Sequence, residues 1–285
     1  MKFSKYQAIG NDFIMVTDTI AKGHSETIRK LCDRHFGIGS DGLIIAEESR
    51  NKEAHLFMDY YNSDGSVAEM CGNGIRCLAK YAYEELCLKT NPLVIDTRNG
   101  VKYCELEVVD DEVRKIKVNM GKASFNPEDL PAFYSNQRIN SKEVFNGEEL
   151  VFTLVSVGNP HIVIFTKNLS DKFICKMGPF LEFHEKFPNR INVNFAEVID
   201  RSNINLRVWE RGCGETLACG TGATASFAAL LKSGLIDQSC KINLRGGSLL
   251  FEKDIDDNLI MIGSAEKVYD GEIGDSFHEA FIKTE

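Results

Sequence analysis

The motif CGNG at residues 71–74 recurs as CGTG at residues 219–222, 148 residues further along the chain. Two other glycine-centred motifs recur at almost the same offset. GNDF at 10–13 returns as GNPH at 158–161, and RNGV at 98–101 returns as RGGS at 245–248. Several turns that recur in the same order indicate an internal duplication. We therefore predict two structural copies, each about half of the chain.

The two copies have similar contents along the sequence. Each has a short apolar strand (13–16 and 162–165), then a candidate helix, then a strand-like run (56–61 and 206–209). Each CGxG motif opens an amphipathic helix, and glycine turns at 99–100 and 246–247 favour hairpins. We predict an α+β fold of two pseudo-symmetric domains, each a mainly antiparallel β-sheet wrapped around a central α-helix. The expected domains are residues 1–121, completed by 270–285, and residues 122–269.

Composition excludes several classes of protein. The 285 residues are 43% hydrophobic and 26% charged, which is typical of a globular protein. A net charge of −9 argues against a nucleic-acid partner. There is no apolar run long enough for a membrane span, and the first residues lack the apolar core of a signal peptide. We expect a cytoplasmic protein without a membrane partner, whose nine cysteines are reduced thiols.

Both CGxG motifs place a cysteine at the start of a predicted helix. The first turn of a helix carries unpaired N–H groups and partial positive charge, which favour a thiolate and attract a substrate carboxylate. Two such thiols in duplicated domains are expected to face each other across the cleft between the domains. A thiolate on one face of an α-carbon and a thiol on the other can invert that centre. No cofactor is then needed, and no lysine motif for pyridoxal phosphate is present.

The two cysteines of the CGxG motifs have three alternative interpretations. A cysteine followed by glycines can be only a tight packing point, although the duplication argues against this. A zinc site would use Cys71, Cys77, Cys213 and Cys219, but the spacing of six within each pair is wider than in ordinary zinc sites, so no metal is expected. A redox disulfide between Cys71 and Cys219 lacks a supporting CxxC motif. The role of Cys213 stays open.

Longer motifs around these cysteines resemble the diaminopimelate epimerase family. They are GNDF (10–13), NSDGSVAEMCGNGIRC (62–77), GNPH (158–161), NVNF (192–195) and ERGCGETLACGTGA (210–223). The resemblance covers nearly the whole chain. It implies the fold of that family and a cofactor-independent isomerase that converts LL-2,6-diaminopimelate to the meso form, for lysine and peptidoglycan precursor synthesis. It also implies a homodimer.

The resemblance carries over to individual positions of this sequence. It implies catalytic roles for Cys71, Cys219, Glu210 and His161. It implies substrate-binding roles for Asn11, Asn62, Gly72, Asn73, Asn159, Asn192, Glu210, Arg211, Gly220 and Thr221. The backbone N–H groups after each cysteine would hold the reacting carboxylate, and Arg211 suits the distal carboxylate. Asn62 and Glu210 each stand nine residues before their cysteine, so the repeat places both beside the expected cleft.

Alternatives remain for both the residues and the reaction. An asparagine in a turn often bonds only its own backbone, and His161 could be an ordinary residue at a strand end. A related racemase of the same fold, acting on proline, hydroxyproline or histidine, is the nearest rival. A thiol-based redox or ligand-binding module is a rival from another class. Glu210 and Arg211 favour a substrate with a second amino-acid head, and hence diaminopimelate.

Overall fold

The computed structural model describes residues 1–19 and 21–274, and the chain divides into two units. Of the described residues, the first unit comprises Met1–Val118 together with residues 263–274, and the second comprises Asn119–Ile262. Residues 275–285, part of the segment expected to complete the first domain, lie outside the described residues.

The first unit is one mixed sheet with a helix on each face. Its strands are β1 (Lys2–Ala8), β2 (Asn11–Val16), β3 (Gly42–Glu47), β4 (Leu56–Asn62), β5 (Val67–Ala68), β6 (Leu93–Asp96), β7 (Lys102–Val109), β8 (Glu112–Asn119) and β18 (Glu266–Glu272). Neighbouring strands pair antiparallel except β2 with β3 and β4 with β6. The chain between each parallel pair contains a helix, α1 (Ser25–Cys32) or α2 (Gly72–Glu84).

The second unit repeats this order. Its strands are β9 (Ser141–Phe145), β10 (Glu148–Ser156), β11 (Pro160–Phe165), β12 (Asn192–Asp200), β13 (Asn203–Glu210), β14 (Gly214–Thr216), β15 (Ser239–Leu244), β16 (Gly247–Lys253) and β17 (Leu259–Gly263). The parallel pairs are β11 with β12 and β13 with β15. Helices α3 (Asp171–Glu182) and α4 (Gly220–Lys232) take the places of α1 and α2, and a short 3₁₀ helix, η1 (Pro127–Asp129), precedes β9. The predicted duplication and α+β class are confirmed.

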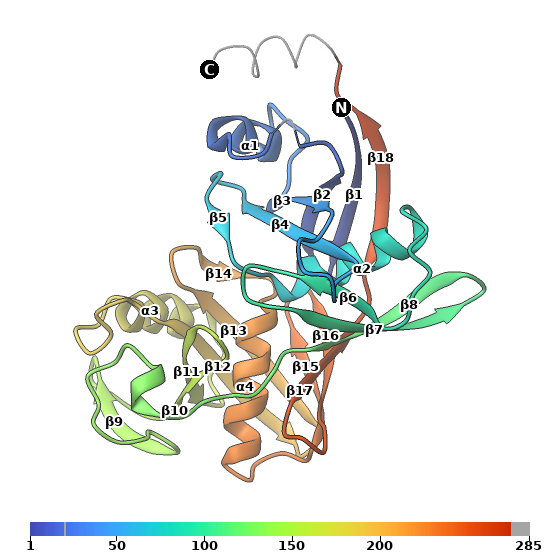
Figure 1. Ribbon diagram of the computed structural model, residues 1–285. Coiled ribbons are helices and arrows are strands. Elements are labelled where there is room, and N and C mark those ends of the chain that lie inside the picture. Colours follow the sequence, from blue (N-terminus) through green and yellow to red (C-terminus); the bar gives the residue numbers. More distant parts are fainter. Residues whose placement is uncertain (20, 275–285) are drawn as a thin grey trace. The chain divides into compact units, whose positions relative to one another are not determined.

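The central strands are covered on both faces, which explains their continuous apolar sequences. In the first unit, Ile14 and Leu43 pack toward α1 in one core cluster, while the neighbouring Ile44 lies against α2 at Gly74. In the second unit, α3 packs on one face of the sheet, and α4 lies along the strands of the other (Figure 1). All residues of α2 from 72 to 82 are buried, so it is the central helix that the pattern predicts.

Glycines set how closely the central helices approach their sheets. A Cβ added at Gly222 would lie 2.6 Å from Asn194 Oδ1, and one at Gly74 would lie 2.9 Å from Ile44 Cδ1. Each helix start is therefore pressed against two strands of its sheet, β3 and β4 in the first unit and β12 and β13 in the second. Register places Gly42 of β3 opposite Asn62 of β4 and beside Phe13 of β2. The first residue of β2, Asn11, contacts Cys71 at the start of α2.

Candidate active site

Cys71 is the N-cap of α2, as the sequence predicts. Its backbone is extended (φ −134°, ψ 123°) and its sulfur accepts a bond from the backbone N–H of Gly74 at 3.4 Å. The Cys71 thiol also lies 3.7 Å from Asn11 Oδ1, to which it donates. An N–H donor at a helix start stabilises negative charge on the sulfur, whereas an acceptor stabilises the protonated thiol. The surroundings of Cys71 thus support both of its protonation states.

A buried guanidinium lies under the first turn of α2. Arg76 is completely buried and donates to the Gly72 carbonyl and to Asn73 Oδ1, both at 3.0 Å. Burial lowers the pKa of Arg76 to about 10, while negative charge at Cys77 and Cys71 would act in the opposite direction. The group therefore stays cationic at neutral pH, and its field favours a thiolate at Cys71. Sequence reasoning missed Arg76, because a charged residue within a helix ordinarily faces solvent.

Cys219 is the N-cap of α4, with the same bond from Gly222 N at 3.4 Å. Its surroundings otherwise differ from those of Cys71. The thiol donates to Glu210 Oε2 at 3.0 Å, and Thr216 donates to the other carboxylate oxygen at 2.5 Å. Burial, and then the charge and hydrogen bond of Glu210, raise the pKa of Cys219 well above its usual value. Cys219 is therefore held as a thiol, and Glu210 is placed to receive its proton.

His161 lies on β11, completely buried. Asn194 Nδ2 donates to the Ile162 carbonyl at 3.3 Å and to His161 Nδ1 at 3.1 Å. Nδ1 is therefore an acceptor, and Nε2–H donates to Asn159 Oδ1 at 2.9 Å. Burial, and then the charge of Arg211, lower the pKa of His161 to about 3. The ring is neutral at physiological pH, and it bonds Asn194 on one side and Asn159 on the other.

The other candidate residues lie around these two helix starts. Asn159 Nδ2 faces Thr221 Oγ1 at 3.5 Å, close to Cys219. Asn192 uses its side chain to join Pro160 O and the backbone N–H of Arg211, both at 3.0 Å. The Arg211 side chain is exposed, with Nη1 donating to Asn189 O at 3.2 Å.

The structure brings most of the candidates together within their own unit. Asn11 and Asn73 contact each other beside Cys71, whereas Asn62 donates to Ser66 at the end of β4. Gly72 and Gly220 are buried at the first positions of α2 and α4. Asn194 went unassigned from sequence although it lies in the NVNF motif, because a buried amide on an apolar strand gives no separate signal.

None of the nine cysteines is part of a disulfide, and Cys213 is exposed in the turn after β13. Within residues 1–19 and 21–274, no group of three His, Cys, Asp or Glu side chains is arranged to hold a metal ion. None of the helices in that part of the chain is long and apolar enough to cross a membrane.

The chain is similar to known proteins over most of its length. The profile of the family described as diaminopimelate epimerase matches residues 3–126 and 153–268. The chain is 42% identical over 277 residues to the diaminopimelate epimerase of Acetivibrio thermocellus, covering 96% of this chain and 98% of that protein. It is 42% identical over 275 residues to that of Clostridium perfringens, covering 95% and 98%.

Two solved structures share the fold at low sequence identity. One is a hydroxyproline epimerase from Agrobacterium vitis, with a TM-score of 0.69 and 11% identity over 96% of this chain and 90% of that one. The other is a probable proline racemase from Agrobacterium radiobacter, with a TM-score of 0.70 and 11% identity over 96% and 92%.

Proposed function

This chain belongs to the diaminopimelate epimerase family, and from that premise we propose that it inverts one α-carbon of LL-2,6-diaminopimelate to give the meso isomer. The observation that carries the proposal is the repeated N-cap cysteine: each of two equivalent units begins its buried central helix with a thiol. An epimerase needs one group to remove the α-proton and another to return a proton to the opposite face. A duplicated helix start supplies two such groups.

The surroundings of the thiols assign their resting roles. Cys219 keeps its proton because it is buried against the Glu210 carboxylate. We assign the thiolate role to Cys71, because the buried Arg76 guanidinium lies in the same helix start. Cys71 then removes the α-proton and Cys219 delivers its own to the other face, and the opposite enantiomer reverses these roles. The proposal requires the two sulfurs to reach opposite faces of the same α-carbon.

The carbanion needs electrostatic stabilisation, since an amino-acid α-proton is very weakly acidic. In this proposal, the backbone N–H groups of Gly72, Asn73, Gly220 and Thr221 hold the reacting carboxylate at the two helix starts, where the helix dipoles favour negative charge. Glu210 also faces an ammonium group of the substrate and serves as the proton partner of Cys219. His161, neutral and buried, assists by orienting Asn159.

The second amino-acid head distinguishes diaminopimelate from smaller substrates. The exposed guanidinium of Arg211 would exchange its bond to Asn189 O for a bidentate pair with the distal carboxylate. Asn11, Asn62, Asn159 and Asn192 are proposed to complete substrate binding, with Asn192 acting through the backbone of Arg211 that it anchors. We also propose that the enzyme needs neither metal nor organic cofactor and acts as a homodimer in the cytoplasm, supplying meso-diaminopimelate for lysine and peptidoglycan precursors.

A substrate panel tests this function. Purified wild-type protein is incubated separately with LL-diaminopimelate, L-proline, trans-4-hydroxy-L-proline and L-histidine, and the stereoisomers are separated on a chiral column. We expect meso-diaminopimelate to form and the other three substrates to remain unchanged. Turnover of proline, hydroxyproline or histidine alone would select the rival racemase activity. Cys71→Ala and Cys219→Ala should each abolish turnover, and full activity in either variant would contradict the two-thiol proposal.

A further inference from the structure

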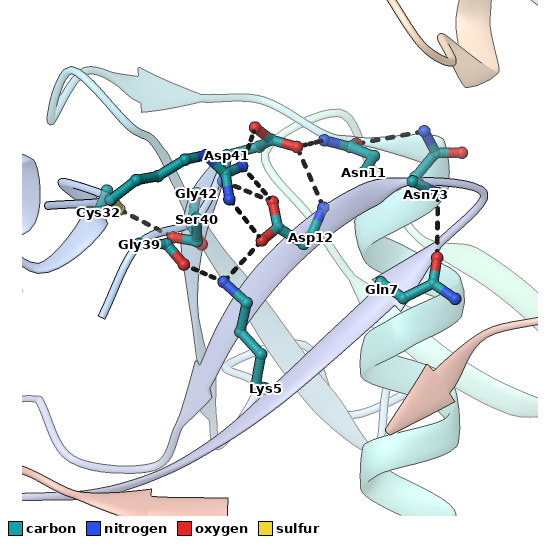
Figure 2. Close-up of polar contacts among 12 residues, drawn as sticks. Lys5, Gln7, Asn11, Asp12, Cys32, Gly39, Ser40, Asp41, Gly42 and Asn73 are labelled. Carbon is teal, nitrogen blue, oxygen red and sulfur yellow. Dashed lines mark hydrogen bonds and ion pairs between the residues drawn. The ribbon is translucent and has the colours of Figure 1, made fainter. Parts of the chain in front are cut away.

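A polar cluster behind Cys71 has no part in the site as described so far. It joins Lys5, Asp12, Arg34 and Asp41 on one side of Asn11 (Figure 2). Asp12 pairs with Lys5 at 2.7 Å and with Arg34 at 2.6 Å. Burial raises the pKa of Asp12, but bonds from Arg34 and Lys5 more than offset this and hold it at about 2. The four side chains of this cluster are therefore held together by ion pairs, and they support the start of β2.

This support fixes the position of the Asp41 carboxylate. One oxygen accepts from Arg34 Nη2 at 2.8 Å. The other accepts from the backbone N–H of Asp12 at 3.1 Å and from Asn11 Nδ2 at 2.8 Å (Figure 2). In return, the backbone N–H of Asp41 donates to the Asp12 carbonyl at 3.0 Å. These bonds hold the Asp41 carboxylate in place, with one oxygen directed at Asn11.

The contact with Asp41 decides which way the Asn11 amide points. A carboxylate only accepts hydrogen bonds, so the NH₂ group of Asn11 must face Asp41 and the oxygen must face α2. That oxygen accepts from Asn73 Nδ2 at 3.2 Å and from the Cys71 thiol at 3.7 Å. Asn73 is oriented from its far side, because its own oxygen accepts from Arg76. A chain of amides thus runs from the Asp41 carboxylate to the Arg76 guanidinium, and the Cys71 thiol contacts its middle.

The second unit holds the equivalent asparagine the other way round. Asn159 is the repeat partner of Asn11, and Thr221 is that of Asn73. His161 Nε2–H donates to the Asn159 oxygen, so the NH₂ group of Asn159 faces Thr221. The first unit therefore turns its asparagine oxygen toward its thiol, whereas the second turns its asparagine NH₂ group toward Thr221. This difference follows from the residue behind each asparagine, a carboxylate in one unit and a neutral imidazole in the other.

We propose that Asp41 is a positioning residue for the epimerase reaction, which holds the Asn11 amide with its oxygen toward Cys71. The oxygen gives the Cys71 S–H a fixed acceptor in the half of the cycle in which Cys71 is protonated. The proton is then aligned before transfer rather than bonded elsewhere. This inference rests on the proposed function of Cys71.

Three variants test the inference, with kcat and KM measured for diaminopimelate epimerisation. Asp41→Asn keeps the shape of the side chain but lets the Asn11 amide face it in either orientation, so kcat should fall at least tenfold while KM changes less than threefold. The exchange N11D/D41N restores an oxygen toward Cys71 in every orientation and lets the amide at position 41 donate to it. The exchange should therefore recover at least half of the decrease in log kcat that D41N shows. Arg34→Gln removes the ion pair but keeps the bond between Asp41 and Asn11, so its kcat should stay within threefold of wild type.

The outcomes separate positioning from support of the fold. If Asp41 only anchors the loop, D41N and R34Q should lose the same activity and the exchange should recover nothing, which would overturn the inference. Wild-type kcat in D41N would also overturn it. If D41N does not fold by circular dichroism, the folded exchange variant decides instead: a kcat within tenfold of wild type supports the inference, and a greater loss overturns it. Failure of the wild-type protein to epimerise diaminopimelate would instead reject the proposed function.

Discussion

Replacing Gly222 by alanine perturbs the closest approach between a central helix and its sheet. The new Cβ would lie 2.6 Å from Asn194 Oδ1 and 3.1 Å from Val208 Cγ1. Asn194 is completely buried, and its amide holds both the Ile162 carbonyl and His161 Nδ1. It therefore has little room to move without giving up one of these bonds. The crowding must therefore displace either α4 or Asn194, which holds His161.

Two opposing terms set the expected magnitude. Alanine is more favourable than glycine inside a helix by about 0.5–1 kcal/mol. Overpacking a rigid core site costs about 1–3 kcal/mol. We therefore expect Gly222→Ala to lower the free energy of unfolding by about 1–2 kcal/mol. Because the shift reaches Asn194, His161 and Asn159 in turn, turnover should fall by at least tenfold.

Gly74→Ala is the matched control in the first unit. Its Cβ would meet the side-chain ends Ile44 Cδ1 at 2.9 Å and Met58 Cε at 3.0 Å. Terminal methyl groups can rotate away, so the helix propensity of alanine should offset the crowding and leave stability within about 1 kcal/mol of wild type.

Urea unfolding measures both variants. Trp209, the only tryptophan, lies in β13 and reports on the second unit by fluorescence, while circular dichroism reports on both units. Wild-type stability and turnover in Gly222→Ala would refute the reasoning. Equal destabilisation by the two substitutions would also contradict it, because the argument depends on a rigid amide in one unit and flexible methyl groups in the other.

Three further predictions follow from the protonation states. Glu210→Gln removes the charge that raises the pKa of Cys219. Iodoacetamide should therefore alkylate Cys219 faster at pH 8 in this variant, as measured by peptide mass spectrometry, while turnover falls. An unchanged alkylation rate would show that the Glu210 carboxylate does not control the pKa of the Cys219 thiol. His161, with a pKa of about 3, should give ¹⁵N chemical shifts of a neutral ring protonated at Nε2 throughout pH 5–8, and a titration in that range would contradict its buried contacts. Asp12 has a pKa of about 2, below its ordinary 3.8, so its contribution to stability is complete above about pH 4 and is lost as the pH falls toward 2. The urea midpoint should therefore decline less between these pH values in Asp12→Asn than in wild type. Parallel declines in the two proteins would argue against the ion pairs of Asp12.

The sequence predicts those features of the fold that depend on local patterns and on the repeat. The helix starts at Cys71 and Cys219 follow from a turn, two glycines and an amphipathic run, and both are confirmed. The hairpin turns before β7 and β16 follow from paired turn residues in the same way. Repetition strengthens each prediction, because one physical solution must serve two sequences.

The supporting side chains of the site could not be predicted, because parallel pairing brings them together over long stretches of chain. Asp41 reaches Asn11 only because β3 lies beside β2, and Asn194 reaches His161 only because β12 lies beside β11. Neither register is encoded by a short motif. Arg76 is similar, since its burial depends on carbonyl and amide acceptors, among them the carbonyl of Ser264, 188 residues later in the chain.

Incorporation of deuterium tests whether two thiols act on opposite faces of one α-carbon. LL-diaminopimelate is incubated with the enzyme in deuterium oxide, and substrate and product are separated at low conversion and examined by mass spectrometry. With two thiols acting on opposite faces, the meso product should carry one deuterium at the inverted α-carbon while the recovered LL substrate remains largely unlabelled. Deuterium entering the recovered substrate as fast as the product would indicate a single base and would contradict the account.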